Sequence, residues 1–195
     1  MKHEGYCKDI SCIILAGGKS ERLHDKPFQM YKQMPLLCHI LDLMKDVFED
    51  IIIVTKDNIQ AERIKQISNV GKIITDNSKD FSPIIGVKKG IQEIKNNSFF
   101  LTACDMPFLT KEIIWKLNKT SKQYSCTIAF SKRYQPFCAI YDKSLFKGCT
   151  INQRMTQLIE NANVNIIYFN NPLNFLNINT LTDLKNAEII KKNNY

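Results

Sequence analysis

The sequence predicts an α/β protein built as a single three-layer α/β/α domain, with a mostly parallel sheet between two layers of helices. Apolar runs of strand length alternate with segments of helical periodicity along the whole chain, the pattern that produces a parallel sheet covered by helices. With 195 residues, 44% of them hydrophobic, the chain is long enough for one full core and short for two. We therefore expect one domain over residues 1–195, with its core at about 10–192.

In the first half of the chain, apolar patterning indicates the elements. The run at 51–55 is almost wholly apolar and has the length of a strand, whereas the apolar residues of 36–48 recur at the spacing of an amphipathic helix. The same two criteria predict strands at 11–16, 51–55, 72–75 and 99–103, and helices at 36–48, 59–67 and 84–95.

The second half continues the alternation. Its predicted elements are a helix at 111–122, strands at 125–130 and 137–141 on either side of a turn at 132–136, a helix at 151–161, a strand at 164–169 and a closing helix at 180–192. Asn179 or Thr180 is expected to be the N-cap of the closing helix, because short polar side chains satisfy the free N–H groups of a first turn.

Composition narrows the class of protein. The seven cysteines include no Cys-x-x-Cys pair and the histidines are dispersed, so we expect reduced thiols, a cytoplasmic location and no zinc site. Residues 1–9 are polar, and no segment approaches about 20 consecutive apolar residues, which argues against a membrane partner. The formal charge of +8 would suit a polyanion. Because aromatic residues do not interleave with a basic stripe, we expect no nucleic-acid partner.

The most informative segment is residues 13–27, where an apolar strand leads into Gly17-Gly18 and then into a basic loop. Adjacent glycines allow backbone turns that other residues avoid, and they let several N–H groups converge on an anion. Lys19, Arg22 and Lys26 add positive charge along the same loop. The spacing matches neither the P-loop nor the Gly-x-Gly-x-x-Gly dinucleotide pattern. It predicts a different kind of cradle for the phosphates of a nucleotide.

Polar, glycine or acidic residues follow predicted strands at four places, namely Gly17-Gly18, Asp76, Asp105 and 177–180. In an open parallel sheet, ligands bind beyond the carboxyl ends of the strands, so these segments are expected to meet at one rim. Asp105 stands at a strand tip just before Met106-Pro107, where the proline ends the strand and leaves the carboxylate as an oxygen ligand of the kind that Mg²⁺ prefers.

Residues 15–26 resemble the Leu-Ala-Gly-Gly-x-Ser-x-Arg-Met-Gly-x-x-Lys signature of the MobA-like nucleotidyltransferases. The signature positions are filled by Leu15, Ala16, Gly17, Gly18, Ser20 and Arg22, and Lys26 stands for the signature lysine one residue earlier in the chain. Leu23 stands for Met, and His24 replaces a Gly, which predicts a stiffer loop with less room near the phosphates. Cytidylyl relatives usually carry Leu-Ala-Ala-Gly, so Gly17 favours a guanine nucleotide.

Four other segments resemble motifs of the same family. Residues 104–107 are similar to Gly/Cys-Asp-Met/Thr-Pro, 82–87 to Gly/Ser-Pro-Leu-x-Gly-hydrophobic, 135–141 to His/Gln-Pro-x-x-Ala-x-Tyr, and 177–184 to Asn-x-Asn-Thr-Pro-x-Asp-Leu. The resemblance thus extends from the first predicted strand to the last predicted helix.

The resemblance implies a Rossmann-like nucleotidyltransferase fold and transfer of GMP from GTP to molybdopterin or its molybdenum-loaded form, with release of pyrophosphate. It assigns catalysis to Lys26, Arg22 and Asp105; nucleotide binding to Leu15, Ala16, Gly17, Gly18, Lys26, Asp76 and Asp105; the Mg²⁺ cofactor to Asp105; and acceptor binding to Gln135, Asn177 and Asn179. Molybdoenzymes or proteins of cofactor biosynthesis are the candidate protein partners.

Three alternatives remain open at this stage. The chain could be another small nucleotidyltransferase, such as a molybdopterin cytidylyltransferase or an enzyme of the phospholactate or methylerythritol-phosphate type. It could be a carrier that binds a nucleotide or cofactor without turnover. It could also be a nucleic-acid binding module, which predicts strongly salt-dependent affinity and leaves Asp105 without a role.

Overall fold

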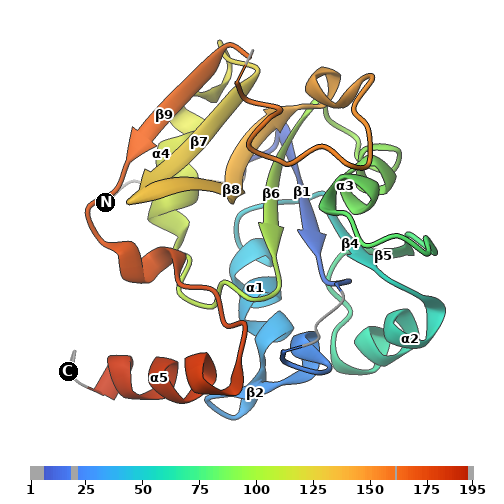
Figure 1. Ribbon diagram of the computed structural model, residues 1–195, viewed down its shortest axis with the longest axis vertical. Coiled ribbons are helices and arrows are strands. Elements are labelled where there is room, and N and C mark those ends of the chain that lie inside the picture. Colours follow the sequence, from blue (N-terminus) through green and yellow to red (C-terminus); the bar gives the residue numbers. More distant parts are fainter. Residues whose placement is uncertain (1–6, 19–21, 161, 193–195) are drawn as a thin grey trace.

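A computed structural model describes residues 7–18, 22–160 and 162–192. Lys19, which the sequence predicts to carry part of the positive charge of the glycine loop, lies outside the described residues, as does Ser20. The described chain forms a sheet with helices on both faces (Figure 1), which confirms the predicted fold class. Within these residues, no helix is both long enough and apolar enough to span a membrane.

The described part of the central sheet contains seven strands in the order β5-β4-β1-β6-β8-β7-β9. They are β1 (Ile10–Leu15), β4 (Ile51–Thr55), β5 (Lys72–Thr75), β6 (Ser98–Ala103), β7 (Cys126–Ser131), β8 (Arg133–Asp142) and β9 (Val164–Tyr168). Only β8 runs antiparallel to its neighbours, β6 and β7. Since β4 and β5 follow β1 on one side and β6 adjoins β1 on the other, the strand order reverses between β1 and β6.

Alternate side chains of β1 point to the two faces of the sheet and join two separate cores. Ile14 belongs to the core that contains residues of α1 (Leu36–Lys45), α2 (Asn58–Ile67) and α4 (Lys111–Ser121). Ile13 belongs to the core on the other face, with α3 (Pro83–Ile91) and the short helix η2 (Lys143–Phe146). The three layers follow from this alternation.

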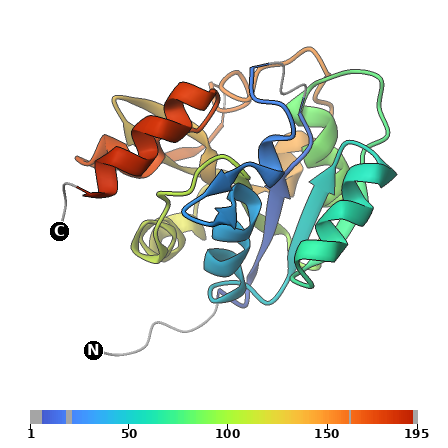
Figure 2. The same cartoon turned by 90° about the horizontal axis from the view of Figure 1, so that it is seen from below.

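The last helix, α5 (Leu181–Lys192), lies outside the three layers in both views (Figures 1 and 2). It packs on a short hairpin formed by β2 (Met30–Tyr31) and β3 (Met34–Pro35), where the Tyr31 hydroxyl donates to the Ala187 carbonyl over 3.3 Å. The sequence did not predict this hairpin, because its turn residues Lys32 and Gln33 adopt positive φ angles of 48° and 63°, a conformation usually signalled by Asn or Gly.

Two predictions of local structure are wrong. The described residues of the expected helix at 151–161 form short turns and irregular backbone instead. Reciprocal hydrogen bonds between Thr150 and Gln153 and between Arg154 and Gln157 close two separate turns in place of one continuous helix. The expected turn at 132–136 is reduced to Lys132, with φ of 59°, and β8 continues through Pro136. The proline is tolerated because the register between β7 and β8 shifts beside it, as in a β-bulge.

Most other boundaries agree with the sequence to within one or two residues, while two helices end early. Helix α1 ends at Lys45 instead of residue 48, and α3 ends at Ile91 instead of residue 95. The chain also forms two further short helices, η1 (Lys26–Phe28) and η3 (Pro172–Phe175), at the approaches to the rim of the sheet.

Candidate nucleotide-binding cleft

A cleft of about 370 Å³ opens at the carboxyl ends of β1 and β6, where the strand order reverses. This is the place where open α/β sheets bind ligands. All four segments that the sequence predicted to meet contribute to its lining. The predicted site residues that line it are Leu15, Ala16, Gly17, Gly18, Lys26, Asp76, Asp105, Asn177 and Asn179. The prediction of a single rim is therefore confirmed.

Gly17 is needed for close packing and not for an unusual backbone conformation. A Cβ atom at this position would lie 2.6 Å from the backbone nitrogen of Lys56, whereas a Cβ on Gly18 meets no described atom within 4 Å. Among the described glycines, only Gly71 and Gly148 have positive φ. The N–H groups of Ala16 and Gly17 both donate to the carbonyl of Val54, over 2.9 Å and 3.2 Å. The expected turn conformation at Gly17-Gly18 is thus wrong, and the N–H of Gly17 is already engaged.

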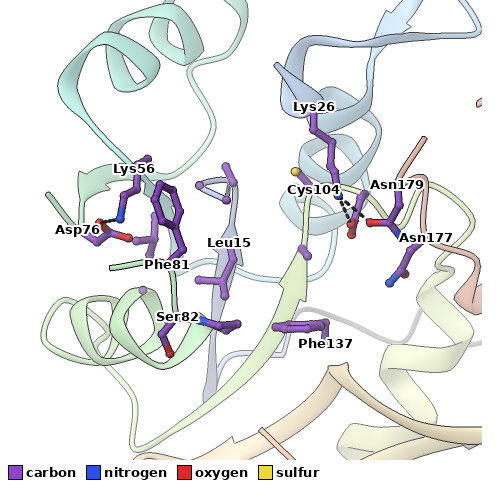
Figure 3. Close-up of a pocket in the computed structure, with 18 residues that line it drawn as sticks. Leu15, Lys26, Lys56, Asp76, Phe81, Ser82, Cys104, Phe137, Asn177 and Asn179 are labelled. Carbon is purple, nitrogen blue, oxygen red and sulfur yellow. Dashed lines mark hydrogen bonds and ion pairs between the residues drawn. The ribbon is translucent and has the colours of Figure 1, made fainter. Parts of the chain in front are cut away.

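Two side-chain oxygens hold the ammonium group of Lys26 on the wall of the cleft next to the end of β6 (Figure 3). This ammonium group donates to Asp105 Oδ2 over 2.9 Å and to Asn179 Oδ1 over 2.8 Å. The side chains of Lys26 and Asp105 are only 16% and 12% exposed, so water screens this ion pair weakly. One cation is therefore held at the point where the loop after β1, the end of β6 and the segment before α5 meet.

Two buried oxygens of residues that line the cleft have no partner among the described residues. They are Oδ1 of Asp105 and Oδ1 of Asn177. A buried oxygen acceptor without a donor is costly, which indicates a ligand that supplies positive charge or N–H groups. The described residues contain no group of three or more His, Cys, Asp or Glu side chains that could hold a metal ion. One carboxylate and one amide oxygen fit Mg²⁺, which is commonly held by one or two carboxylates together with substrate phosphates.

The neighbouring thiol does not add to this ligand set. Burial raises the pKa of Cys104, and the nearby carboxylate of Asp105 raises it further. The thiol therefore remains protonated near neutral pH, whereas a cysteine that binds metal does so as a thiolate.

The segment that carries Asn177 and Asn179 is anchored to the sheet at one end and to α5 at the other. The N–H of Ile178 donates to the carbonyl of Asp105 over 2.9 Å, which ties this segment to the end of β6. Asp183 Oδ2 accepts from the N–H groups of Asn179 and Thr180, and Thr180 Oγ1 accepts from the N–H of Asp183. These reciprocal bonds form a capping box with Thr180 as the N-cap of α5.

Lys56, which the sequence analysis did not select, forms the other wall of the cleft together with Asp76 and Phe81 (Figure 3). Its ammonium group donates to Asp76 Oδ1 over 3.1 Å and to the Asp80 carbonyl over 2.7 Å. A signal existed, because Lys56 directly follows β4. Its lysine side chain gives no sign in the sequence that it turns back toward Asp76, because that contact joins residues 20 positions apart.

Two predicted site residues, Arg22 and Gln135, do not line the cleft, and neither does His24, which replaces the signature glycine. Arg22 is exposed and does not line the cleft. Gln135 is buried in the β7–β8 hairpin, where its amide donates to the carbonyls of Ser131 and Arg133, and Phe137 of the same strand lines the cleft. The His24 side chain is 98% exposed and lies outside the lining, and its effect on room near the phosphates stays a prediction.

The chain is similar in sequence to known nucleotidyltransferases. Residues 12–164 match the MobA-like NTP transferase domain. The chain is 31% identical to a Clostridium perfringens (strain 13) protein named "Probable molybdenum cofactor guanylyltransferase", over 93% of this chain and 96% of that protein. It is 28% identical to the molybdenum cofactor guanylyltransferase of Haemophilus influenzae (strain 86-028NP), over 92% and 98% of the two chains.

Solved structures agree with this fold. Molybdopterin-guanine dinucleotide biosynthesis protein A from Archaeoglobus fulgidus superposes with a TM-score of 0.79 at 23% identity, covering 94% of this chain and 100% of that one. A Mycobacterium tuberculosis protein solved as a complex with manganese superposes with a TM-score of 0.74 at 13% identity, covering 93% and 98% of the two chains.

Proposed function

Because this chain belongs to the MobA-like NTP transferase family, we propose that it transfers GMP from GTP to molybdopterin or its molybdenum-loaded form. An oxygen of the acceptor phosphate forms a bond to the α-phosphorus of GTP, and the bond from that phosphorus to the β-phosphate oxygen breaks. The products are pyrophosphate and the guanine dinucleotide form of the cofactor. The chain is a nucleotidyltransferase, and its relatives that are similar over almost their whole length are named guanylyltransferases.

The observation that carries the proposal is the arrangement around Lys26. A reaction of this type needs charge neutralisation and positioning more than a covalent intermediate. Lys26 is held within 2.9 Å of Asp105 and 2.8 Å of Asn179 at the end of β6, and the glycine loop lines the same cleft. Lys26 would offset negative charge on the phosphoryl group in transfer, with Arg22 and Lys19 adding to the positive field of the loop.

The remaining roles divide between the two walls of the cleft. Leu15, Ala16, Gly17, Gly18 and Asp76 would hold the nucleotide. Asn177 and Asn179 would hold the acceptor, and Gln135, which is buried outside the cleft, would act only by supporting the strand that carries Phe137. Asp105, together with the amide oxygen of Asn177, would hold Mg²⁺, which when bound supplies positive charge for the phosphates of the donor.

We further propose that the chain works as a single cytoplasmic domain. All seven cysteines are free thiols and six of them are buried, as expected for a protein of a reducing compartment. Its substrates would be two small anionic molecules, and the proteins that supply the acceptor or receive the product are the candidate protein partners.

The test of this function is pyrophosphate release by the purified protein with Mg²⁺ and molybdopterin, using GTP, CTP, ATP and UTP in parallel. Release with GTP alone is the expected result. A preference for CTP would assign the chain to the cytidylyl enzymes. GTP binding without release under any condition would instead support a carrier that has lost turnover.

A further inference from the structure

Lys56 connects three parts of the cleft through one residue. Its backbone nitrogen donates to Gln60 Oε1 over 2.9 Å and lies against the α-carbon of Gly17, so that even a methyl group there would collide with it. Its ammonium group reaches in the opposite direction, to the segment that follows β5, where it donates to Asp76 and to the carbonyl of Asp80. Lys56 therefore contacts both the loop that contains Gly17 and Gly18 and the segment at 76–81.

The bond from Lys56 orients the carboxylate of Asp76. Oδ1 of Asp76 accepts from the Lys56 ammonium over 3.1 Å and from the N–H of Ser78 over 2.9 Å. Both bonds use the same oxygen, and no described residue donates a hydrogen bond to Oδ2. The two side chains are 18% and 11% exposed, so the pair is weakly screened. Lys56 and Ser78 thus fix the orientation of a carboxylate that lines the cleft and has one oxygen without a described donor.

The same ammonium group also fixes an aromatic wall. Lys56 Nζ lies 4.5 Å from the centre of the Phe81 ring, within the range of a cation–π contact. Phe81 lines the cleft next to Ser82 and Pro83 at the start of α3, although the residue is 53% exposed. A half-exposed ring at the mouth of a cleft needs a partner to stay in one position, and the bond from Lys56 to the Asp80 carbonyl holds the preceding peptide.

We propose that Lys56 is a positioning residue that sets the affinity for the nucleoside part of the donor, by orienting the Asp76 carboxylate and the Phe81 ring. The inference rests on the proposed function, because it takes the donor to be GTP. A carboxylate oxygen accepts hydrogen bonds from ribose hydroxyls or from the N–H groups of guanine, and an aromatic ring packs on a flat base. Lys56 lies on the opposite wall from Lys26 and Asp105, so its effect is on binding of the donor and not on the transfer step.

The experiment measures GTP affinity by calorimetry without acceptor, and then KM for GTP and kcat with acceptor, for Lys56→Met and Lys56→Arg. Loss of a weakly screened charged hydrogen bond is expected to raise both Kd and KM for GTP roughly 10- to 100-fold while kcat changes little. Lys56→Arg keeps the charge and the donors and is expected to restore part of the affinity. Lys122→Met is the matched control, since Lys122 forms its 3.0 Å ion pair with Asp9 on the exposed surface.

A double-mutant cycle with Asp76→Asn shows whether Lys56 acts through Asp76. If it does, Lys56→Met adds much less to Kd in the Asp76→Asn background than in the wild type. Full additivity, an unchanged Kd, or a loss confined to kcat would each overturn the positioning role while leaving the guanylyltransferase function in place. Failure of the wild type to bind any nucleotide would instead overturn the proposed function. If Lys56→Met lowers the melting temperature so far that it is not folded in the assay, Lys56→Arg and Lys56→Gln carry the same comparison.

Discussion

At the scale of single residues, one wall of the cleft depends on the ammonium group of Lys26, which two side-chain oxygens share. Lys26 bonds to Asp105 Oδ2 and to Asn179 Oδ1, while Oδ1 of Asp105 and Oδ1 of Asn177 are buried without a described donor. Among the described residues, this wall of the cleft therefore has more hydrogen-bond acceptors than donors. A metal ion bound to nucleotide phosphates would supply the missing positive charge. Because the proposed roles of Asp105 and Lys26 differ, substitutions of the two residues are expected to have different effects.

Asp105→Ala is expected to abolish Mg²⁺-dependent pyrophosphate release while the protein keeps its fold, because a carboxylate at a strand tip contributes little to packing. The measurement combines the release assay with circular dichroism and with Mn²⁺ binding followed by electron paramagnetic resonance in the presence of GTP. Asp105→Asn serves as the variant of equal size. Normal Mn²⁺ binding by Asp105→Ala would contradict the role of this residue as the metal ligand.

Lys26→Ala is expected to lower kcat/KM by roughly 100- to 1000-fold, the typical effect of removing one electrostatic donor to a transition state. Steady-state kinetics with GTP and acceptor check this value. Lys65→Ala is a suitable control, because Lys65 forms a surface ion pair with Glu62 on α2. Wild-type kinetics in Lys26→Ala would remove this lysine from the mechanism.

At the scale of elements, the close approach of the loop after β1 to the residue after β4 depends on one glycine of the Gly17-Gly18 pair. The backbone of Gly17 lies against the residue that follows β4, while a side chain on Gly18 would point into open space among the described residues. The pair therefore provides an internal comparison between two neighbouring substitutions of the same chemistry.

Gly17→Ala is expected to destabilise the protein by about 1–3 kcal/mol, the usual cost of overpacking. At roughly 2–4 °C per kcal/mol for a protein of this size, the melting temperature falls by several degrees. Gly18→Ala is expected to leave it nearly unchanged. Scanning calorimetry of both variants measures the difference, and equal melting temperatures would show that Gly17 does not need to be a glycine for packing.

The start of α5 sets the position of Asn179 through Asp183. Partial burial of Asp183 opposes its ionisation, but hydrogen bonds from the N–H groups of Asn179 and Thr180 and the charge of Arg22 outweigh it, so the pKa lies below the ordinary value. A carboxylate with a depressed pKa in the folded state stabilises the fold above its unfolded pKa of about 4. This contribution is lost as the pH falls through the lower folded pKa.

Asp183→Ala is therefore expected to lower the free energy of unfolding at pH 7 by about 1 kcal/mol, as for a lost helix cap. The difference from the wild type is expected to vanish once the pH falls below the folded pKa. Urea denaturation across the acid range measures it. The variant is also expected to raise KM for the acceptor, since Asn179 loses one of its anchors. A stability difference that persists unchanged in acid would exclude the carboxylate as its cause.

At the scale of the whole molecule, a single sheet supports two cores and the cleft together. The core beside α1, α2 and α4 and the core beside α3 share β1 and β6, and the cleft opens at the ends of these two strands. Unfolding of either core would remove a wall of the other, because the strands of the sheet are common to both.

The chain is therefore expected to unfold in one cooperative transition, with equal calorimetric and van't Hoff enthalpies. GTP with Mg²⁺ is expected to raise the melting temperature by mass action, by an amount that grows with ligand concentration. Scanning calorimetry tests both expectations. Two resolved transitions would show that the chain contains two independent units, and a shift produced equally by all four nucleoside triphosphates would argue against selection of guanine.

Much of the architecture could be predicted because its signals are local. A wholly apolar run such as that of β4, the helical spacing in α1, and the proline after Asp105 each depend on a few neighbouring residues. The same holds for the residues of the rim, because a polar residue placed directly after an apolar strand must emerge at the end of the sheet. The segment at 151–160 was misassigned, because its apolar spacing is helical while the bonds between Thr150 and Gln153 and between Arg154 and Gln157 close two separate turns.

The α/β fold class, the family and most of the side chains at the rim could be read from the sequence, because periodicity and motif spacing are properties of neighbouring residues; Lys56, Arg22 and Gln135 are the exceptions. The partners and the exposure of these side chains follow from the tertiary structure. It paired Lys56 with Asp76 over 20 residues and Lys26 with Asp105 over 79, buried Gln135 within its own hairpin, and turned His24 toward solvent. These outcomes depend on contacts between distant segments, which form only when the packed sheet brings those segments together.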